Sequence, residues 1–374
     1  MSTILYTGGM VLLWLINLLN GTGLGAVYHT TEYARILAFA VAVLLFIWEG
    51  RFRDGWLVPK KHFLILVGMV ALFVSVSYFK GFKFVSLEYL WVFLVTYIIS
   101  RTRPRKEDLY WVGIAYAVLG LAILFIWNFM TALSGWNENT IAMIGLFSFL
   151  TFTIPYYGIR DVKSMVMISL VGAAYVFLIW PTGSRSCCFA VVLNLLIVFR
   201  VLPFEKIFRK KWRIQLALHV PLIIALLGCL VAATADMGAL NEWSQGEFGK
   251  DLFSGREEMW KSYLTIIAQN PLFGTGNMNS GNHHNSAMTC LLTYGVVGYG
   301  LWIAIFDVML EKTLHYWDDI CVAGAISAFF VIFWQQSVEL GMICSGPSLL
   351  PYAIMGMLLA RTKKLKETEC QELV

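Results

Sequence analysis

The amino-acid sequence predicts an all-α, polytopic integral membrane protein of about twelve transmembrane helices, with one long external loop that carries an amphipathic helix. The chain of 374 residues is 59% hydrophobic and 14% charged, whereas an average soluble domain carries about 25% charge. The mean hydropathy is +0.70. Apolar runs near the ~20 residues that a spanning helix needs recur along the whole chain. We therefore expect residues 1–374 to form a single transmembrane domain.

The expected spans follow one another from the first residues to the last. They cover residues 4–20, 29–48, 62–79, 84–100, 109–133, 139–158, 163–181, 185–202, 213–233, 283–310, 317–337 and 345–361. The first run has no cleavage-site pattern and many runs follow it, so we expect a span there and not a signal peptide. The seven cysteines show no paired spacing, which argues against a disulfide framework and against a zinc site.

The distribution of lysine and arginine predicts the orientation of these spans, because short cytoplasmic loops are rich in both. Of the 28 basic residues, 21 lie in alternate loops and after the last span. We expect that side to be cytoplasmic, together with both chain termini and a tail over residues 361–374. A single miscounted span would break the alternation, so the pattern also supports twelve spans.

The long loop over residues 234–282 is expected on the external side. Its segment "SGREEMWKSYLTIIAQNP" has apolar residues at helical spacing, which predicts an amphipathic helix on the outer surface. Ser254 is the expected N-cap and Pro271 ends the pattern. A stretch rich in glycine and asparagine follows, and it includes Gly274 and Gly276.

Two polar motifs mark the outer boundary of the membrane. In "GWNENTIAM", Asn137 and Asn139 flank Glu138; these residues either contact a ligand or cap a helix, with equal weight for both interpretations. In "PTGSRSC", Ser184 is expected to cap a helix that opens with Arg185. Arginine beside free backbone N–H groups makes an anion site, although a solvated arginine is the alternative.

Two further features lie in and after the external loop. Arg256 opens the amphipathic helix, where the helix dipole disfavours a cation, so an arriving anion would remove the conflict. His284 precedes the tenth span, and a histidine suits the role of general base. A metal site would need a third ligand, and no clear cluster lies nearby in the sequence.

Together the two arginines and His284 predict a site for a multivalent anion at the outer leaflet, because arginine binds phosphate oxygens bidentately. The natural anion at that depth is a lipid-linked phosphate or diphosphate. The glycine- and asparagine-rich stretch is then expected to form the outer lip of the site. The external acids Glu32, Glu138 and Glu339 are candidates to orient His284 or to bind sugar, and the sequence does not choose among them.

At these residues the sequence resembles the superfamily of O-antigen ligases and Wzy-type polysaccharide polymerases. The resemblance rests on "NEN", "TGSR", "SGREEMWKSYLTIIAQNPLFGTG" and "HNSAMTCLLTYGVVG", in that order, over residues 137–310. The last motif matches the pattern of His284 and Asn285 followed by Gly295 and Gly298. Glu138 departs from the family, which often has proline at this position.

The resemblance implies a metal- and cofactor-independent, inverting glycosyltransferase of the GT-C type in the bacterial cytoplasmic membrane, with its active site facing outside. The donor would be a glycan on undecaprenyl diphosphate, with Arg185 and Arg256 on the diphosphate and His284 near the acceptor hydroxyl. Substrate contacts are expected from Asn137, Asn139, Ser184, Gly274, Gly276 and Asn285. Expected partners are the donor, a glycan acceptor, the bilayer and other polysaccharide-export proteins, but not nucleic acid.

Three functions remain open at this point. A polymerase, which we favour because polymerases are the more numerous branch, joins lipid-linked repeat units to one another. A ligase transfers the glycan to a different acceptor, such as lipid A core. A transporter could use Arg35, Glu138, Arg185 and Glu339 along a pathway, but the span centres are nearly free of charge, which disfavours it.

Overall fold

The protein is helical throughout the part of the chain that the structure describes. This computed structural model describes residues 3–21, 30–48, 60–80, 87–130, 137–208, 210–235, 237–249, 251, 253–277, 284–343 and 348–372. No strand occurs among these residues. The α-helices are α1 (Thr3–Gly21), α3 (Thr30–Trp48), α4 (Lys60–Phe79), α5 (Leu87–Ile99), α6 (Lys106–Phe129), α7 (Glu138–Thr153), α8 (Val162–Ile179), α9 (Arg185–Val198), α10 (Phe204–Phe208), α11 (Lys211–Leu218), α12 (Val220–Thr234), α13 (Met237–Phe248), α14 (Arg256–Gln269), α15 (Ser286–Glu311), α16 (Ile320–Gln335) and α17 (Leu349–Glu372). Short 3-10 helices are η3 (Ile154–Tyr156), η4 (Trp180–Thr182) and η5 (Leu314–Tyr316).

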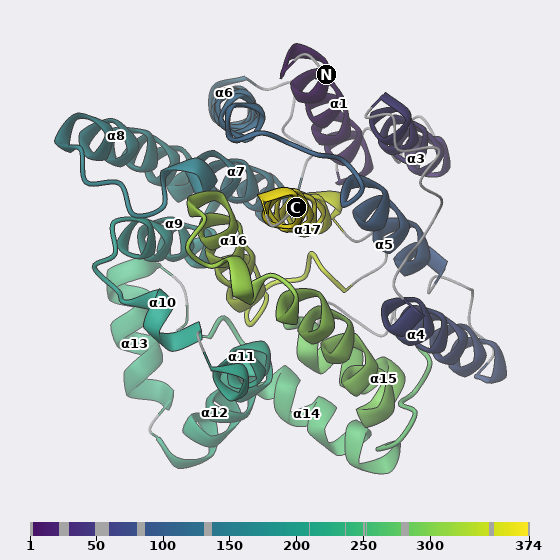
Figure 1. Ribbon diagram of the computed structural model, residues 1–374. Helices are drawn as coiled ribbons and strands as arrows, with labels where there is room; N and C mark the ends of the chain where they lie inside the picture. Colours follow the sequence, from purple (N-terminus) through teal and green to yellow (C-terminus); the bar gives the residue numbers. More distant parts are fainter. Residues whose placement is uncertain are drawn as a thin grey trace.

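A central group of helices is surrounded by the others. Figure 1 looks along the bundle and shows α7, α16 and α17 in the middle, with α1, α3, α4, α6, α8 and α15 around them. In α7 and α16 nearly every residue is buried, as expected of helices that are apolar on all sides and packed on all sides. The peripheral helix α8 instead exposes large apolar side chains, among them Leu170 and Phe177. An apolar outer surface suits contact with lipid.

Helices occur at every one of the twelve predicted spans. By length and apolar composition, four described helices are able to cross a membrane: α6, α7 with η3, α8 with η4, and α15. The number rises to five if α11 and α12, which bend by 53° at His219, form one broken span. The multi-pass membrane class is therefore confirmed, while the count of twelve stays a prediction.

Polar caps begin several of these helices. Asn137 accepts a hydrogen bond from the backbone N–H of Thr140 at the start of α7. Asp161 does the same for Ser164 at the start of α8. Asp319 accepts from the backbone N–H groups of Cys321 and Val322 at the start of α16. Each cap satisfies N–H groups that the helix itself leaves unpaired.

Helix α15 is broken at Gly295, where the backbone adopts φ 66° and ψ −170°. This conformation is open essentially only to glycine. The loop after α14 fills the break: the N–H groups of Thr275 and Gly276 donate to the carbonyls of Leu292 and Thr293. Val296 and Val297, beyond the break, donate to the carbonyls of Pro271 and Leu272. We call this backbone junction of residues 271–276 with α15 the seam.

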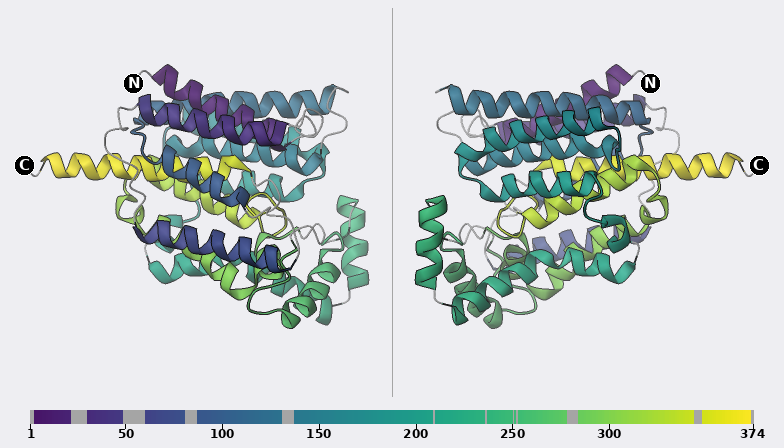
Figure 2. Two further views of the ribbon diagram at one scale, coloured as in Figure 1. Left: turned by 90° about the vertical axis from the view of Figure 1, so that its right-hand side faces the viewer. Right: turned by 90° about the vertical axis from the view of Figure 1, so that its left-hand side faces the viewer.

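The two ends of the bundle differ, as Figure 2 shows. At one end α13 lies across the other helices beside α14, and we call this the α13 end. At the opposite end the last turns of α17 project from the bundle, and we call this the C-terminal end. The expected tail over residues 361–374 therefore continues α17 as a helix up to Glu372.

Two expectations about the 234–282 segment need revision. The predicted amphipathic helix is present as α14, but its N-cap is Gly255 with φ 74°, and not Ser254. Gly255 occupies the cap because the chain turns through the left-handed region here, and Ser254 itself has φ 55°. The second helix of this segment, α13, was not predicted, because "MGALNEWSQGEF" is too polar to show an apolar stripe.

Candidate functional site

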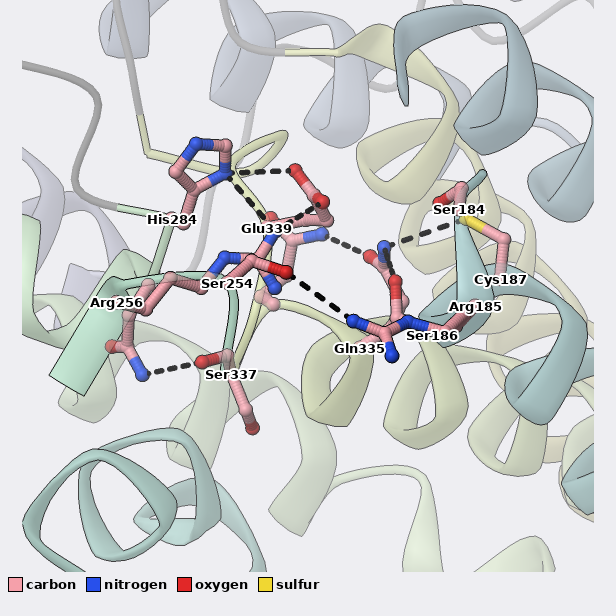
Figure 3. Close-up of polar contacts among 12 residues, drawn as sticks. Ser184, Arg185, Ser186, Cys187, Ser254, Arg256, His284, Gln335, Ser337 and Glu339 are labelled. Atoms are coloured by element: carbon pink, nitrogen blue, oxygen red, sulfur yellow. Dashed lines mark hydrogen bonds and ion pairs between the residues drawn. The ribbon is translucent and has the colours of Figure 1, made fainter. Parts of the chain in front are cut away.

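The predicted site residues come from four segments that meet at the α13 end of the bundle. Arg185 is the first residue of α9, and Arg256 is the first residue of α14. His284 lies two residues before α15, and Glu339 lies just beyond the end of α16. Figure 3 shows these side chains gathered in one region, although they are up to 154 positions apart in the sequence.

Glu339 joins Arg256 to His284. Its Oε1 accepts a hydrogen bond from Nη2 of Arg256 at 3.0 Å, and its Oε2 lies 3.3 Å from Nδ1 of His284. Nη2 of Arg256 is also 3.4 Å from Nδ1 of His284. The Glu339 side chain is only 6% exposed, and those of Arg256 and His284 are 18% and 19% exposed. The nearly buried Glu339 carboxylate thus lies between two groups that are predicted to take part in catalysis.

The chain before α15 is built to hold His284 in place. His284 has φ 44°, in the left-handed region that costs a non-glycine residue free energy. The next residue, Asn285, is fully buried and caps α15 by accepting from the backbone N–H of Met288. Its amide also donates to the carbonyls of Pro221 and Ser337 at 2.8 Å each. Asn285 therefore ties the start of α15, next to His284, to α12 and to the segment after α16.

Arg185 reaches from α9 across to the segment between α12 and α14. Its Nη2 donates to the carbonyl of Asp251 at 3.0 Å and to Oγ of Ser254 at 3.2 Å. Its Nη1 lies 3.4 Å from Oγ of Ser244 on α13. These three acceptors are neutral oxygen atoms.

The two guanidinium groups are close enough to repel each other. Burial lowers the pKa of Arg256, the adjacent Glu339 carboxylate raises it, and the charge of Arg185 lowers it. The site thus contains two positive charges, on Arg185 and Arg256, and one negative charge, on Glu339. An anion that entered between the arginines would relieve their repulsion and compete with Glu339 for Arg256.

Two buried glutamines at the end of α16 complete the site and were missed by the sequence analysis. Gln335 Nε2 lies 3.4 Å from Oγ of Ser186, in the first turn of α9. Gln336 Nε2 donates to Oε1 of Gln335 at 2.7 Å, and Gln336 Oε1 accepts from Ser286 Oγ and from the backbone N–H of Met342. The sequence does contain a signal for these two glutamines: "QQSVE" is a polar run at the predicted outer end of an otherwise apolar span.

The remaining predicted residues take up different positions. Asn137 is exposed and caps α7, which agrees with the capping interpretation, and Asn139 is the second residue of the same helix. Ser184 is the N-cap of α9 but makes no capping bond with its side chain. Its buried Oγ has no hydrogen-bond partner in the described part of the chain. A ligand at the start of α9 could supply that partner.

The predicted lip glycines belong to the seam. Gly274 and Gly276 have φ of 67° and 72°, and a Cβ on Gly274 would touch the backbone of Thr293 and Tyr294. Close packing against α15 explains the glycine at 274, and close packing against Val76 and Lys80 at the end of α4 explains the glycine at 276. The contact of either glycine with substrate stays a prediction. Met278 to His283 of the lip lie outside the described residues.

Of the acids predicted to be external, Glu339 contacts His284 in the described part of the chain. Glu138 is exposed at the first position of α7. The side chain of Glu32 lies outside the described residues. The candidate site therefore consists of a histidine, its adjacent carboxylate and two arginines at the α13 end. Such an arrangement can hold an oxyanion and accept a proton beside it.

Residues 164–303 match a family model described as O-Antigen ligase. The matched segment includes Arg185, Arg256 and His284, and it ends before α16 and Glu339. No curated protein matches the chain.

Proposed function

Residues 164–303 place the chain in the superfamily of O-antigen ligases and Wzy-type polymerases, which are membrane glycosyltransferases, and on that premise we propose that it polymerises lipid-linked glycan repeat units. The donor is a glycan on undecaprenyl diphosphate, and the acceptor is a second lipid-linked unit. The reaction takes place at the α13 end, which faces the outside of the bacterial cytoplasmic membrane. This orientation follows from the lysine and arginine distribution.

The observation that carries the proposal is the contact of Glu339 with both Arg256 and His284, beside Arg185. The acceptor hydroxyl attacks the anomeric carbon of the donor, and the bond from that carbon to the diphosphate oxygen breaks. The diphosphate leaves with the electron pair of that bond, and Arg185 and Arg256 stabilise its charge. The hydroxyl proton passes to His284. Direct displacement of this kind inverts the anomeric centre.

Glu339 is a positioning residue in this scheme. Because its Oε2 faces Nδ1 of His284, the tautomer with the proton on Nδ1 gains a hydrogen bond, and Nε2 keeps the lone pair for the acceptor hydroxyl. The carboxylate also stabilises the imidazolium that forms when the proton arrives. When the diphosphate draws Arg256 away, Glu339 becomes fully available to His284. Donor binding thereby prepares the base.

A ligase is the second candidate, because the matching family model is described as O-Antigen ligase. A ligase and a polymerase would use the same donor site and differ in the acceptor. In the ligase case the glycan passes to a different acceptor, such as lipid A core.

The test is a gel of the products formed by purified protein in lipid. Protein supplied only with lipid-linked repeat unit should give a ladder of longer lipid-linked chains, because one molecule type serves as donor and acceptor. If transfer appears only after lipid A core is added, the ligase is correct. Activity that is equal in the wild type and in His284→Ala would remove His284 as the base. The absence of transfer with both acceptors would contradict the glycosyltransferase assignment.

A further inference from the structure

A pair of glutamines lies where α16 ends, beside the candidate site. Gln336 is fully buried, and Gln335 is only 5% exposed. A buried amide is costly unless its polar atoms find hydrogen-bond partners. Apolar side chains of the same shape would fill this space with little loss of stability, because the net gain from buried hydrogen bonds is small. The amide pair therefore needs a reason other than stability.

The hydrogen bonds of the pair run in one direction. The backbone N–H of Met342 lies 3.0 Å from Oε1 of Gln336, and a backbone N–H can only donate, which identifies this atom as the oxygen. Nε2 of Gln336 then donates to Oε1 of Gln335 at 2.7 Å. Nε2 of Gln335 faces the start of α9, at 3.4 Å from Oγ of Ser186 and 3.6 Å from Sγ of Cys187 (Figure 3). The pair thus forms a directed chain from the segment after α16 to α9.

One end of this chain shapes the turn that carries Glu339. By accepting from the N–H of Met342, the side chain of Gln336 closes the backbone over residues 336–342. Glu339 lies in the middle of this closed turn, and its carboxylate faces Nδ1 of His284 at 3.3 Å. The closure therefore restricts where the carboxylate can lie relative to the imidazole.

The same amide also holds the start of α15, next to His284. Oε1 of Gln336 accepts from Oγ of Ser286 at 3.1 Å, and the backbone carbonyl of Gln336 accepts from the backbone N–H of Ser286 at 3.0 Å. Ser286 is the first residue of α15, two positions after His284. The other end of the chain reaches the first turn of α9, which opens with Arg185. Gln336 therefore touches the histidine side of the site directly and reaches the arginine side through its neighbour.

We propose that Gln335 and Gln336 are positioning residues of the transfer reaction. Gln336 holds Glu339 against His284, and Gln335 holds the first turn of α9, with Arg185, at a set distance from them. Buried hydrogen-bond networks that are fully satisfied fix one arrangement of the groups they join. A misplacement of about 1 Å near reacting groups can cost roughly 100-fold in rate. This inference rests on the proposed glycosyl transfer, and both residues lie beyond the segment that matches the family model.

Steady-state kinetics of the purified protein in lipid, with lipid-linked repeat unit as the donor, separate the two roles. Gln336→Met keeps the volume but loses the bond to Met342, so Glu339 is held less well and kcat should fall by about tenfold, as for one lost hydrogen bond. Gln335→Met leaves the turn closed, so kcat should stay within about twofold while KM for the donor rises by about fivefold. An unchanged KM in Gln335→Met would overturn the proposal, even if Gln336→Met fails to fold.

A double-mutant cycle tests whether Gln336 acts through Glu339. If it does, Gln336→Met combined with Glu339→Gln should have the kcat of Glu339→Gln alone to within about twofold, because the effect of the first change depends on the carboxylate that the second removes. A purely structural role would multiply the two losses of kcat, and that result would overturn the proposal.

Asn128→Leu is the matched control, because it also removes a side-chain amide that joins two helices. Asn128 donates to the carbonyls of Leu124 and Leu178 at 2.8 Å each, and neither residue belongs to the site. The melting temperature of this variant should fall about as far as that of Gln335→Met, while kcat and KM stay unchanged. Equal kinetic losses in the control and in the glutamine variants would reduce the effect to stability and overturn the positioning role.

The same assay separates this inference from the proposed function. A wild type that transfers no glycan would contradict the proposed function and the positioning role together. A wild type that transfers glycan, with normal kcat and KM in both Gln335→Met and Gln336→Met, would overturn the positioning role alone.

Discussion

Glu339 connects the two chemical tasks of the site at the level of a single residue. It touches the guanidinium that would hold the leaving group and the imidazole that would receive the proton. Because the carboxylate is nearly buried, replacing it affects both neighbours and leaves the charge of Arg256 without its partner. A buried charge that loses its partner is costly, by about 3–5 kcal/mol for fully buried pairs.

We therefore predict that Glu339→Gln lowers the rate of transfer by about 10–100-fold, the usual cost of losing a residue that orients a catalytic histidine. The amide keeps the volume but removes the charge that stabilises the imidazolium. A rate assay with lipid-linked donor measures the effect, and a melting curve measures the accompanying loss of stability. Glu138→Gln, an exposed acid on α7, is the control and should leave both quantities unchanged. Normal turnover in Glu339→Gln would exclude a role in positioning His284.

Arg185 gives a second prediction at this scale. Arg185→Lys keeps the charge but loses the planar fork that binds two phosphate oxygens at once, so donor turnover should fall by at least about tenfold. The same substitution at Arg160, an exposed residue in the loop before α8, should have no effect. Donor binding measured with a fluorescent lipid diphosphate separates the outcomes. Wild-type affinity in Arg185→Lys would argue against a diphosphate contact.

The sequence allowed part of this site to be predicted, for identifiable reasons. Arg185 and Arg256 stand out because basic residues at an outer membrane boundary oppose the usual topology, and His284 stands out because a histidine at the start of a span suits a general base. Glu339 could be named only as one of three acids, because its contact with His284 spans 55 positions in the sequence and depends on packing. The hydrogen bonds made by the side-chain amides of Gln335 and Gln336 depend on packing in the same way.

At the scale of the element, the seam gives a structural reason for Gly274 and Gly295, which the sequence motif contains without explaining. The break in α15 at Gly295 exposes carbonyls on one side and N–H groups on the other, and residues 271–276 satisfy both sets. Apolar periodicity predicted a single helix here, because side chains on both sides of the break remain buried and the pattern carries no interruption. The amphipathic helix α14 was predictable, since its stripe faces one side only.

Gly295→Ala should therefore destabilise the fold by about 2–4 kcal/mol. The Cβ would clash with the backbone of Leu272 and Phe273, and alanine does not adopt this backbone conformation readily. Gly300→Ala, five residues further along the same helix, is the matched control, because a Cβ there meets open space and alanine favours a helix. Melting curves of the two variants in the same detergent compare them. Equal melting temperatures would contradict the geometry of the seam.

At the scale of the whole molecule, the two ends of the bundle differ: α13 crosses one end, where the candidate site lies, and the last turns of α17 project from the other (Figure 2). The apolar runs predicted where helices form, since bilayer thickness sets their length. The break in α15 and the crossing helix α13 could not be predicted in this way, because tertiary contacts determine them. The number of spans and their direction follow from charge alternation and remain to be measured.

Cysteine labelling measures that direction. Cys370 is exposed on α17, so a membrane-impermeant maleimide should reach it only after spheroplasts are permeabilised. Ser262→Cys, at an exposed position of α14, should be labelled in intact spheroplasts. Cys370→Ser should abolish the signal that permeabilisation reveals. If Cys370 and Ser262→Cys react from the same side of the membrane, the proposed orientation is wrong.

The seam also bears on how such a protein can diversify. Arg256 begins α14 and His284 lies just before α15, and backbone hydrogen bonds join the loop after α14 to α15. Apart from the glycines of the seam, these bonds do not depend on the identity of the side chains. Mutations elsewhere in the chain should therefore change the distance between Arg256 and His284 only a little. The surrounding helices can therefore change in sequence to accommodate new sugars and acceptors while the seam keeps its backbone hydrogen bonds.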